Sequence, residues 1–475
     1  MSNEAGAPAN VAVIGGGISG LAAAWFLRQG LGQDARIVVY EKKSAIGGHL
    51  RVSDVAGVPV DEGAESLLAR RPEAVELAQA VGLGDDVVHP AGVGAALWTR
   101  DQLTALPAGT VMGVPERPEA TGGVLDEAEI ARAVADAHEP GMPIDGDIAI
   151  GRLVRDRFGP AVAERLVEPL LGGVYAGRAD ELSLDATVPA LGEQVRRHRS
   201  LGAAVAAVRA AAPAVAGPVF AGLRGGVGRL PDAVAAASAA TLRTGVTVRE
   251  LHRSAEGWRV VSGPVPSPEV DEVDAVVMAV PAAPAARLLR PECPAAAAEL
   301  AGVEAASMAI VTLALPRSAF PTLPSTSGFL VPPVDGRLVK AVTYSSVKWP
   351  WLGAASGDLV VLRASIGRHG QVAELQRDDA DLVTGVLADL RDATGLSGTP
   401  VDSRVTRWGG ALPQYTVGHV ERVARIRAAV DATPGLAVCG ALYDGVGVAA
   451  CVASARAAAR RVVDELAAQH VRIGS

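Results

Sequence analysis

Residues 10–22 read NVAVIGGGISGLA and bring three structural signals together in one short stretch. An apolar, β-branched start predicts a buried strand, a glycine-rich turn follows, and small apolar residues then open a helix. The glycine spacing is that of a dinucleotide site, in which the glycines allow a tight turn, close approach of a pyrophosphate and close helix packing. We expect phosphate groups at the helix N-terminus, held by Gly15, Gly16, Gly17, Ile18, Ser19 and Gly20.

The glycine spacing alone is weak, because a chain rich in alanine and glycine produces it by chance, but its context is specific. Residues 36–40, RIVVY, predict a second strand, and Glu41 ends it about 20 residues after the last glycine. An acidic side chain at this point binds ribose hydroxyls. Glu41, with Lys42 beside it, is therefore assigned to the cofactor.

Two further motifs follow, Gly47-Gly48-His49-Leu50-Arg51 and Val60-Asp61-Glu62-Gly63-Ala64-Glu65-Ser66. Their order after the glycine-rich turn resembles the N-terminus of the glutathione-reductase-like FAD enzymes, in the branch of the amine oxidases and protoporphyrinogen oxidases. The resemblance implies non-covalent FAD rather than a nicotinamide cofactor, since NAD dehydrogenases lack these two further motifs. It places Gly48, His49 and Arg51 at the FAD phosphates, and Gly63, Ala64, Glu65 and Ser66 beside the flavin ring.

At 475 residues the chain exceeds one ordinary core, so we expect several subdomains. The resemblance implies an α/β fold: a Rossmann FAD domain, a β-sheet substrate domain and an inserted helical lobe. The expected boundaries are 1–90, 219–290 and 405–475 for the FAD domain, 91–110 and 295–404 for the substrate domain, and 111–218 for the lobe.

Local patterns predict further elements along the chain. We expect helical structure over 65–88, a hairpin over 97–106, a mostly helical region over 148–225, a helix after 224–231, strands at 246–251 and 274–281, β-rich runs at 309–315, 338–344 and 359–366, and a strand at 436–443 before a C-terminal helix. The resemblance implies that Val248 touches the adenine. It also assigns Trp408 and the final turn to the flavin, with Gly440, Val446, Gly447 and Val448 as its contacts.

A more specific match concerns the substrate. Residues 408–419 read WGGALPQYTVGH, and PLLGGVYAG at 169–177 and YSSVKWP at 344–350 accompany them. These stretches resemble the oxygen-dependent protoporphyrinogen and coproporphyrinogen oxidases of haem synthesis, over nearly the whole chain. The resemblance implies oxidation of coproporphyrinogen III to coproporphyrin III, with O2 as the acceptor and H2O2 as its product.

The expected substrate carries four carboxylates, which arginine binds in a bidentate manner. Arg70 and Arg71 are the leading predicted contacts, although they could be solvated charges at a helix start. Lys348 is the next, and Tyr175 either lines the site or lies in the core. We assign no catalytic protein base, because flavin N5 accepts the hydride, and we expect Tyr415 and His419 to pack beneath the flavin.

Composition limits the classes of partner. The net charge of -8 argues against nucleic acid binding, and the three cysteines, which have no metal-ligand spacing, favour a reduced cytoplasm. The first ten residues lack the basic region of a signal peptide, and the apolar region 201–223 is interrupted by Arg209, Pro213 and Pro218, so no spanning helix is expected. The expected partners are a tetrapyrrole, O2 and, transiently, downstream haem-synthesis enzymes, with no metal.

Several alternatives remain open from the sequence. Protoporphyrinogen IX is an alternative substrate, and it differs from coproporphyrinogen III only in groups that would lie at the rim of the pocket. A flavin amine oxidase shares the fold, but it predicts an aromatic cage where this chain has 3% aromatic residues. A polyene desaturase would need an apolar substrate tunnel. A flavin-binding protein without turnover would retain the same motifs.

Overall fold

The strand β1 (Asn10–Ile14) lies at the centre of a parallel five-stranded sheet in the computed structural model, which describes residues 8–139, 141, 144–212 and 217–473. The sheet order is β12 (Thr241–Thr244), β2 (Arg36–Glu41), β1, β16 (Ala275–Met278) and β22 (Leu436–Val438). Alternate β1 side chains enter different cores: Val11 and Val13 pack on one face, Ala12 and Ile14 on the other. Because β1 is covered on both faces, it is apolar throughout, as parallel strands are.

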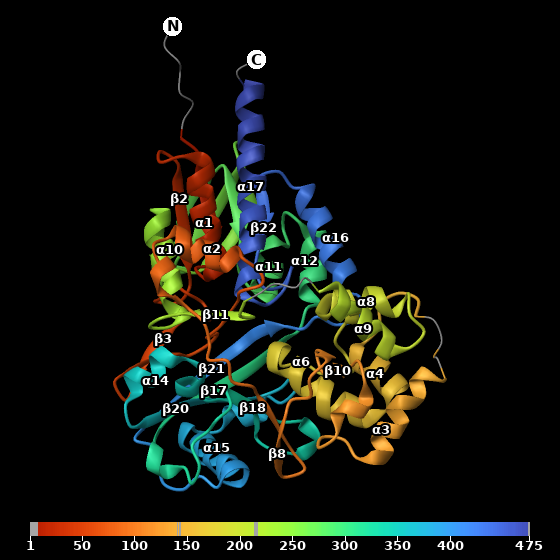
Figure 1. Ribbon diagram of the computed structural model, residues 1–475. Coiled ribbons are helices and arrows are strands. Elements are labelled where there is room, and N and C mark those ends of the chain that lie inside the picture. Colours follow the sequence, from red (N-terminus) through yellow and green to blue (C-terminus); the bar gives the residue numbers. More distant parts are fainter. Residues whose placement is uncertain (1–7, 140, 142–143, 213–216, 474–475) are drawn as a thin grey trace.

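Both faces of this sheet are covered (Figure 1). One core contains α1 (Ile18–Leu31), α2 (Glu73–Ala80), α10 (Leu230–Ser238) and α17 (Val448–Ile473). The opposite core contains α11 (Ala282–Leu289), α12 (Pro294–Ala301), α16 (His419–Asp431) and a small antiparallel sheet of β13 (Val248–Arg253), β14 (Trp258–Ser262) and β15 (Glu269–Val273). This is the expected Rossmann arrangement, in which ligands bind beyond the carboxyl ends of the strands.

A seven-stranded sheet forms the second domain. Its order is β21 (Asp402–Pro413), β17 (Ala305–Pro316), β20 (Leu359–Ile366), β19 (Val339–Thr343), β18 (Gly328–Leu330), β7 (Ala96–Thr99) and β8 (Gln102–Ala105). The helix α15 (Asp379–Thr394) covers one face through Leu382, Val386 and Leu390. The expected hairpin at 97–106 is confirmed, because β7 pairs with β8 around Arg100 and Asp101, both of which have positive φ.

A helical lobe lies beside this sheet, as expected (Figure 1). It contains α3 (Glu127–Val134), α4 (Ile150–Phe158), α5 (Pro160–Val162), α6 (Glu168–Tyr175), α7 (Leu184–Thr187), α8 (Pro189–Val195) and α9 (Leu201–Ala211), with the ribbon of β9 (Thr110–Val111) and β10 (Val114–Pro115). Short pairings complete the structure: β3 (Val52–Val55) with β4 (Val58–Asp61), and β11 (Phe220–Leu223) with β5 (Leu67–Leu68) and β6 (Val87–Val88). The helices α13 (Ser345–Lys348) and α14 (Pro350–Ser356) connect β19 to β20.

Three expectations need correction. The helix expected over 65–88 is only α2, because Leu67 and Leu68 pair with β11 and Pro72 precedes the first helical residue. The strand expected over 436–443 ends at Val438, and Gly440 has a φ of +136° that a strand does not adopt. Residues 402–413 pair with β17 in the seven-stranded sheet, so the part of the last FAD segment from 405 to 413 belongs to that sheet.

Cys439 and Cys451 are buried as free thiols in an apolar core, as expected for small apolar groups. In the part of the chain that the structure describes, no helix is long and apolar enough to cross a membrane. Residues 1–7, which carry most of the signal-peptide prediction, and Pro213 lie outside the described residues.

Candidate functional site

The glycine-rich turn after β1 is built without room for side chains. Gly15 has a φ of +114°, and a Cβ there would lie 2.5 Å from the Ala279 carbonyl oxygen. A Cβ on Gly20 would lie 1.9 Å from the Gly15 carbonyl oxygen. The close approach of α1 to this turn therefore requires glycine at position 20, as the motif predicts.

The N-terminus of α1 has the properties of an anion site. Its N-cap residue is Gly17, no side chain caps it, and the first turn contains no acidic residue. A Cβ on Gly17 would meet no atom closer than 3.9 Å, so this backbone faces open space. The first N–H groups of a helix lack intrahelical partners, and the helix dipole favours negative charge there. This end of α1 suits a pyrophosphate.

Glu41 is buried at the end of β2 and points at the same turn. Its Oε2 accepts a hydrogen bond from the Gly16 N–H at 2.8 Å, and its Oε1 accepts one from the Lys43 N–H at 2.8 Å. Each carboxylate oxygen retains a second lone pair for a hydroxyl group. The Lys42 side chain is exposed beside it.

The second glycine motif joins the first. The Gly47 N–H donates to the Gly16 carbonyl at 2.8 Å, and Gly17 and Gly47 form a parallel bridge. His49 packs edge-on against Trp408 with ring centroids 5.1 Å apart, and Trp408 Nε1 donates to the Glu62 carbonyl at 2.8 Å. Trp408, in the middle of β21, thus joins this strand to His49 and to Glu62 of the following motif. Arg51 remains largely exposed, 3.5 Å from the Glu62 carboxylate.

The segment expected beside the flavin ring is held by a buried ion cluster. Glu65 Oε1 accepts from Lys348 Nζ at 2.6 Å, and its Oε2 accepts from Arg363 Nη1 at 2.9 Å and from Ser345 Oγ at 3.0 Å. Arg363 also donates to the Gly63 carbonyl. Burial opposes ionisation, but the charges of Lys348 and Arg363 outweigh it and lower the pKa of Glu65 to about 2.

This cluster changes the interpretation of two residues. Lys348, a predicted substrate contact, donates to Glu65 and, at 2.9 Å, to Ser66 Oγ, so it holds the segment that carries both residues. Arg363 was missed by the sequence analysis. Its signal is a lone cation in the buried strand LVVLRASI at 359–366, where a charge needs a partner.

Asp61 links the segment to another loop. Its carboxylate accepts hydrogen bonds from the N–H groups of Val227 at 3.0 Å and Gly228 at 2.8 Å. Burial raises the pKa of Asp61 to about 6 despite these bonds. The aspartate of the motif therefore fixes the loop before α10.

The final turn, residues 439–447, is expected at the flavin and is held by side chains packed against it. The His419 and Tyr415 rings stack with centroids 4.0 Å apart. His419 Nε2 donates to the Leu442 carbonyl at 2.9 Å, and the Tyr415 hydroxyl donates to the Ala441 carbonyl. The Gly440 N–H donates to Ser454 Oγ of α17 at 3.0 Å. Both side chains hold the backbone between β22 and α17, and their packing beneath the flavin stays a prediction.

We expect Tyr415→Phe to loosen this turn without disrupting the fold. The Ala441 carbonyl loses its buried donor, which costs about 1 to 3 kcal/mol. The measurement is the flavin dissociation constant and the urea unfolding midpoint, with Tyr344→Phe as control, since burial raises the pKa of both phenols and Tyr344 packs in the other sheet core. An unchanged flavin affinity would show that the hydroxyl does not act on the turn.

The remaining predicted residues are Val248, Arg70, Arg71 and Tyr175. The Val248 carbonyl accepts from Arg287 Nη2 at 3.2 Å. Arg71 Nη2 donates to Glu73 at 2.9 Å, while Arg70 is exposed and forms no ion pair with any described residue. Tyr175 is buried in the lobe core, tilted against Tyr415 at 5.4 Å, and burial raises its pKa to about 12.

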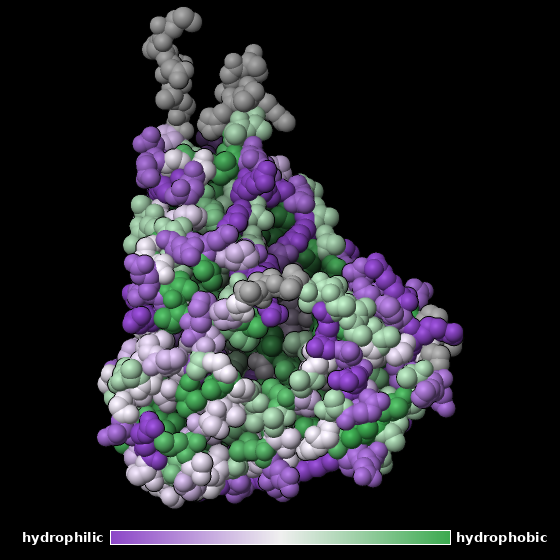
Figure 2. Space-filling view, in the orientation of Figure 1, coloured by the Kyte–Doolittle hydropathy of each residue, from purple (hydrophilic) through white to green (hydrophobic). Residues whose placement is uncertain are grey.

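The surface is hollowed between the two domains. Figure 2 shows the hollow in the region bounded in Figure 1 by β11, the seven-stranded sheet and α6, with apolar residues visible inside it. Large apolar side chains are exposed on these elements: Leu68 on β5, Phe220 on β11 and Val174 on α6. A hollow with apolar walls and a few convergent polar groups is typical of a small-molecule site.

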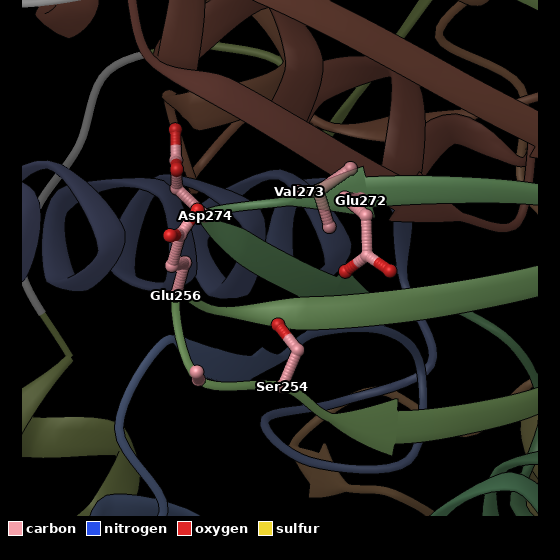
Figure 3. A pocket seen from close by; sticks show the side chains of 6 residues that line it. Ser254, Glu256, Glu272, Val273 and Asp274 are labelled. Atoms are coloured by element: carbon pink, nitrogen blue, oxygen red, sulfur yellow. The ribbon is translucent and has the colours of Figure 1, made fainter.

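A separate surface pocket does not belong to this site. It is lined by residues including Glu256, Glu272 and Asp274 (Figure 3), and Asp274 accepts a hydrogen bond from the Asn10 N–H at 2.6 Å. Asn10 begins β1, so the pocket lies at the opposite end of the sheet from the glycine-rich turn. Its three carboxylates would repel a pyrophosphate, and no metal-binding cluster of His, Cys, Asp or Glu occurs among the described residues.

The residues at the carboxyl end of the parallel sheet fit an FAD molecule. An uncapped helix N-terminus suits its phosphates, a buried glutamate suits a ribose, and glycines leave the backbone open between them. The sequence matches the family described as flavin containing amine oxidoreductase over residues 18–463. The chain belongs to this family of FAD-dependent oxidoreductases.

Within the family, several similar proteins have names that specify a substrate. A Mycobacterium tuberculosis protein named coproporphyrinogen III oxidase is 38% identical, over 98% of this chain and 100% of its own length. Bos taurus protoporphyrinogen oxidase is 29% identical over 95% of this chain and 98% of its own. A crystal structure from Exiguobacterium sp. 255-15, of a candidate protoporphyrinogen oxidase, has a TM-score of 0.85 and 29% identity, covering 96% of this chain and 99% of that one.

Proposed function

We propose that this chain is an FAD-dependent oxidase that converts coproporphyrinogen III to coproporphyrin III, consuming O2 and releasing H2O2. The observation that carries the proposal is the 38% identity to the M. tuberculosis protein of that name over 98% of this chain and 100% of that one. A match of this extent covers both domains and the helical lobe as well as the nucleotide motifs. The hollow itself has the apolar walls that a tetrapyrrole requires.

The bound FAD supplies a two-electron acceptor that O2 regenerates, so the protein mainly binds and orients. The α1 N-terminus and Glu41 would hold the dinucleotide, and Trp408 packs edge-on against His49 of the second glycine motif. Arg363 and Lys348 fix Gly63, Glu65 and Ser66 through buried hydrogen bonds. We assign no protein base. The six-electron oxidation would remove three hydrides, one from each of three bridging carbons, and three protons, two from pyrrole N–H groups and one from the fourth bridging carbon, and these protons would leave through water.

The direct test is anaerobic mixing of the purified yellow protein with coproporphyrinogen III and, separately, with protoporphyrinogen IX. We expect the flavin absorption to bleach rapidly with coproporphyrinogen III and slowly with protoporphyrinogen IX. Bleaching only by protoporphyrinogen would establish the substrate of the Bos taurus relative instead. Bleaching by neither, with intact flavin, would leave an amine oxidase, a polyene desaturase or a non-catalytic flavoprotein.

A second prediction concerns the two arginines that follow β5. Arg70 is exposed and forms no ion pair with a described residue, whereas Arg71 already binds Glu73. We therefore expect Arg70→Ala to raise KM more than it lowers kcat, since a carboxylate far from the reacting carbon contributes uniform binding. A bidentate contact is worth roughly 1.5 to 3 kcal/mol. Steady-state kinetics would measure this change, with Arg100→Ala as the control, since Arg100 is an exposed arginine of the β7–β8 turn. If both variants matched the wild type, Arg70 would not be a substrate contact.

The cytoplasmic location and a transient contact with the next haem-synthesis enzyme are part of the same proposal. The exposed apolar side chains of Leu68 and Phe220 beside the hollow support a contact of this kind. Cross-linking of the holoprotein with the enzyme that consumes coproporphyrin would test it, and loss of the cross-link in Phe220→Ser is the expected result.

A further inference from the structure

Among the described residues, three buried cations lie outside the Glu65 cluster: Arg28, which donates to five backbone carbonyls, and two others. Lys340 of β19 is 4% exposed, and Arg368, two residues after β20, is 9% exposed. The Lys340 Nζ atom is buried and has no hydrogen-bond partner among the described residues. Arg368 Nη2 donates to the Val331 carbonyl at 3.1 Å, and neither cation forms an ion pair within the described ranges.

Both cations lie where the seven-stranded sheet meets α6. The His369 N–H donates to the Ala176 carbonyl at 2.6 Å, which fastens the segment after β20 to the end of α6. The pairing of β19 with β20 shifts register between Val339 and Ala341, so Lys340 occupies a β-bulge. Bulges beside active sites redirect side chains.

The local charges do not balance. Burial and the charge of Arg368 lower the pKa of Lys340 to about 7, and burial also raises the pKa of Glu168, the carboxyl that acts on Arg368. Glu168 Oε2 is already engaged by the Ala179 N–H at 2.7 Å. Isolated buried charges are costly unless they are paired. Two cations therefore face one carboxyl group, which already accepts a hydrogen bond, so an additional anion could balance their charge.

Residues close to these cations are partly exposed, although the Lys340 Nζ atom itself is buried. Ala341 and Thr343 of β19 and Ser365 of β20 are partly exposed although they lie in the interior of a seven-stranded sheet. On the facing helix α6, Gly173 and Val174 are exposed. The hollow seen in Figure 2 lies in the region of Figure 1 between the seven-stranded sheet and α6.

We infer that Lys340 and Arg368 bind one carboxylate of the substrate at the inner end of the hollow. The inference rests on the proposed function for the identity of that group, a propionate of the tetrapyrrole. Arg70 and Arg71 lie outside this sheet, so the two sets of cations would hold different carboxylates of one molecule. The inner contact would fix which bridging carbon faces the flavin.

The first experiment is a titration of the FAD-loaded protein with coproporphyrin III, followed by porphyrin fluorescence. Lys340→Met keeps the length of the side chain and removes the charge, and we expect its dissociation constant to rise about tenfold or more. Lys340→Arg, which keeps the charge, should retain most of the affinity. Arg337→Gln is the matched control, because this substitution also removes one cationic side chain. Arg337 pairs instead with Asp101 and Asp392, each at 2.6 Å.

Stability separates binding from a structural role. An unpaired buried ammonium contributes nothing to folding, so Lys340→Met should be at least as stable as the wild type in urea. A less stable Lys340→Met would show that the amine has a structural partner and would overturn the inference. Equal affinity of Lys340→Met and the wild type would overturn it as well.

Calorimetry provides an independent readout. The groups that act on this site are Arg368 and Glu168, with Arg178 and Asp180 acting on Glu168. Because the bound carboxylate would restore the charged form of Lys340, binding at pH 8 should take up close to one proton, seen as a binding enthalpy that depends on the buffer. Lys340→Met should lose this uptake. A wild type that fails to bleach with coproporphyrinogen III would refute the proposed function and this inference together, whereas normal bleaching with no proton uptake would refute the inference alone.

Discussion

Gly20→Ala is expected to yield a protein that is purified without its flavin. The added Cβ would lie 1.9 Å from the Gly15 carbonyl oxygen, which is backbone and has no rotamer by which to move away. Gly15 itself is confined, because its own Cβ position lies 2.5 Å from the Ala279 carbonyl. The α1 N-terminus must therefore shift away from the turn, and with it the N–H groups that suit the pyrophosphate.

Overpacking of this kind costs about 1 to 3 kcal/mol even where neighbours yield. Since the displaced backbone is also the phosphate site, we expect FAD affinity to fall about tenfold or more. The measurement is the ratio of flavin to protein absorbance after purification, followed by titration with FAD. Gly92→Ala is the control, because its Cβ would meet no atom within 4 Å. A Gly20→Ala protein as yellow as Gly92→Ala would contradict the assignment of this turn.

Glu65→Gln should cause the largest loss of stability among the site variants. The carboxylate balances Lys348 and Arg363, whose side chains are 18% and 7% exposed. Removing one partner of a buried ion cluster leaves uncompensated charge and costs about 3 to 5 kcal/mol. Urea unfolding of the holoprotein measures this loss. Lys348→Met in the Glu65→Gln background should recover part of it, because one of the two stranded cations is then gone.

The same variant predicts a pH dependence. The pKa of Glu65 is about 2 in the folded chain and near 4.5 when unfolded, so its contribution is full above pH 4.5 and is lost as the pH falls toward 2. The stability difference between wild type and Glu65→Gln should therefore narrow from pH 5 to pH 3. Asp61, whose pKa is raised to about 6, is present in both chains and cancels in the difference. A constant difference would show that Glu65 is not held ionised by the cluster.

Local patterns were sufficient wherever one segment carries its own physical signal. The apolar run of β1, the glycines at 15, 17 and 20, and Glu41 after β2 predicted the Rossmann sheet and the cofactor, because these features act over a single β–α–β unit. The strand at 359–366 was also expected. Its Arg363 was overlooked because the partner carboxylate lies 298 positions earlier in the chain.

The sequence by itself determined the family, the flavin domain and the two apolar faces of its sheet, since strand and helix periodicities and glycine spacing are local properties of the backbone. Only the tertiary structure decided which charges meet. Lys348, a predicted substrate contact, binds Glu65, and Lys340, a single cation in an apolar stretch, lies near Arg368 because of a bulge and the contact with α6. Charges act through space over a few ångströms, and the pairing of distant segments that brings them together is not written in any one of those segments.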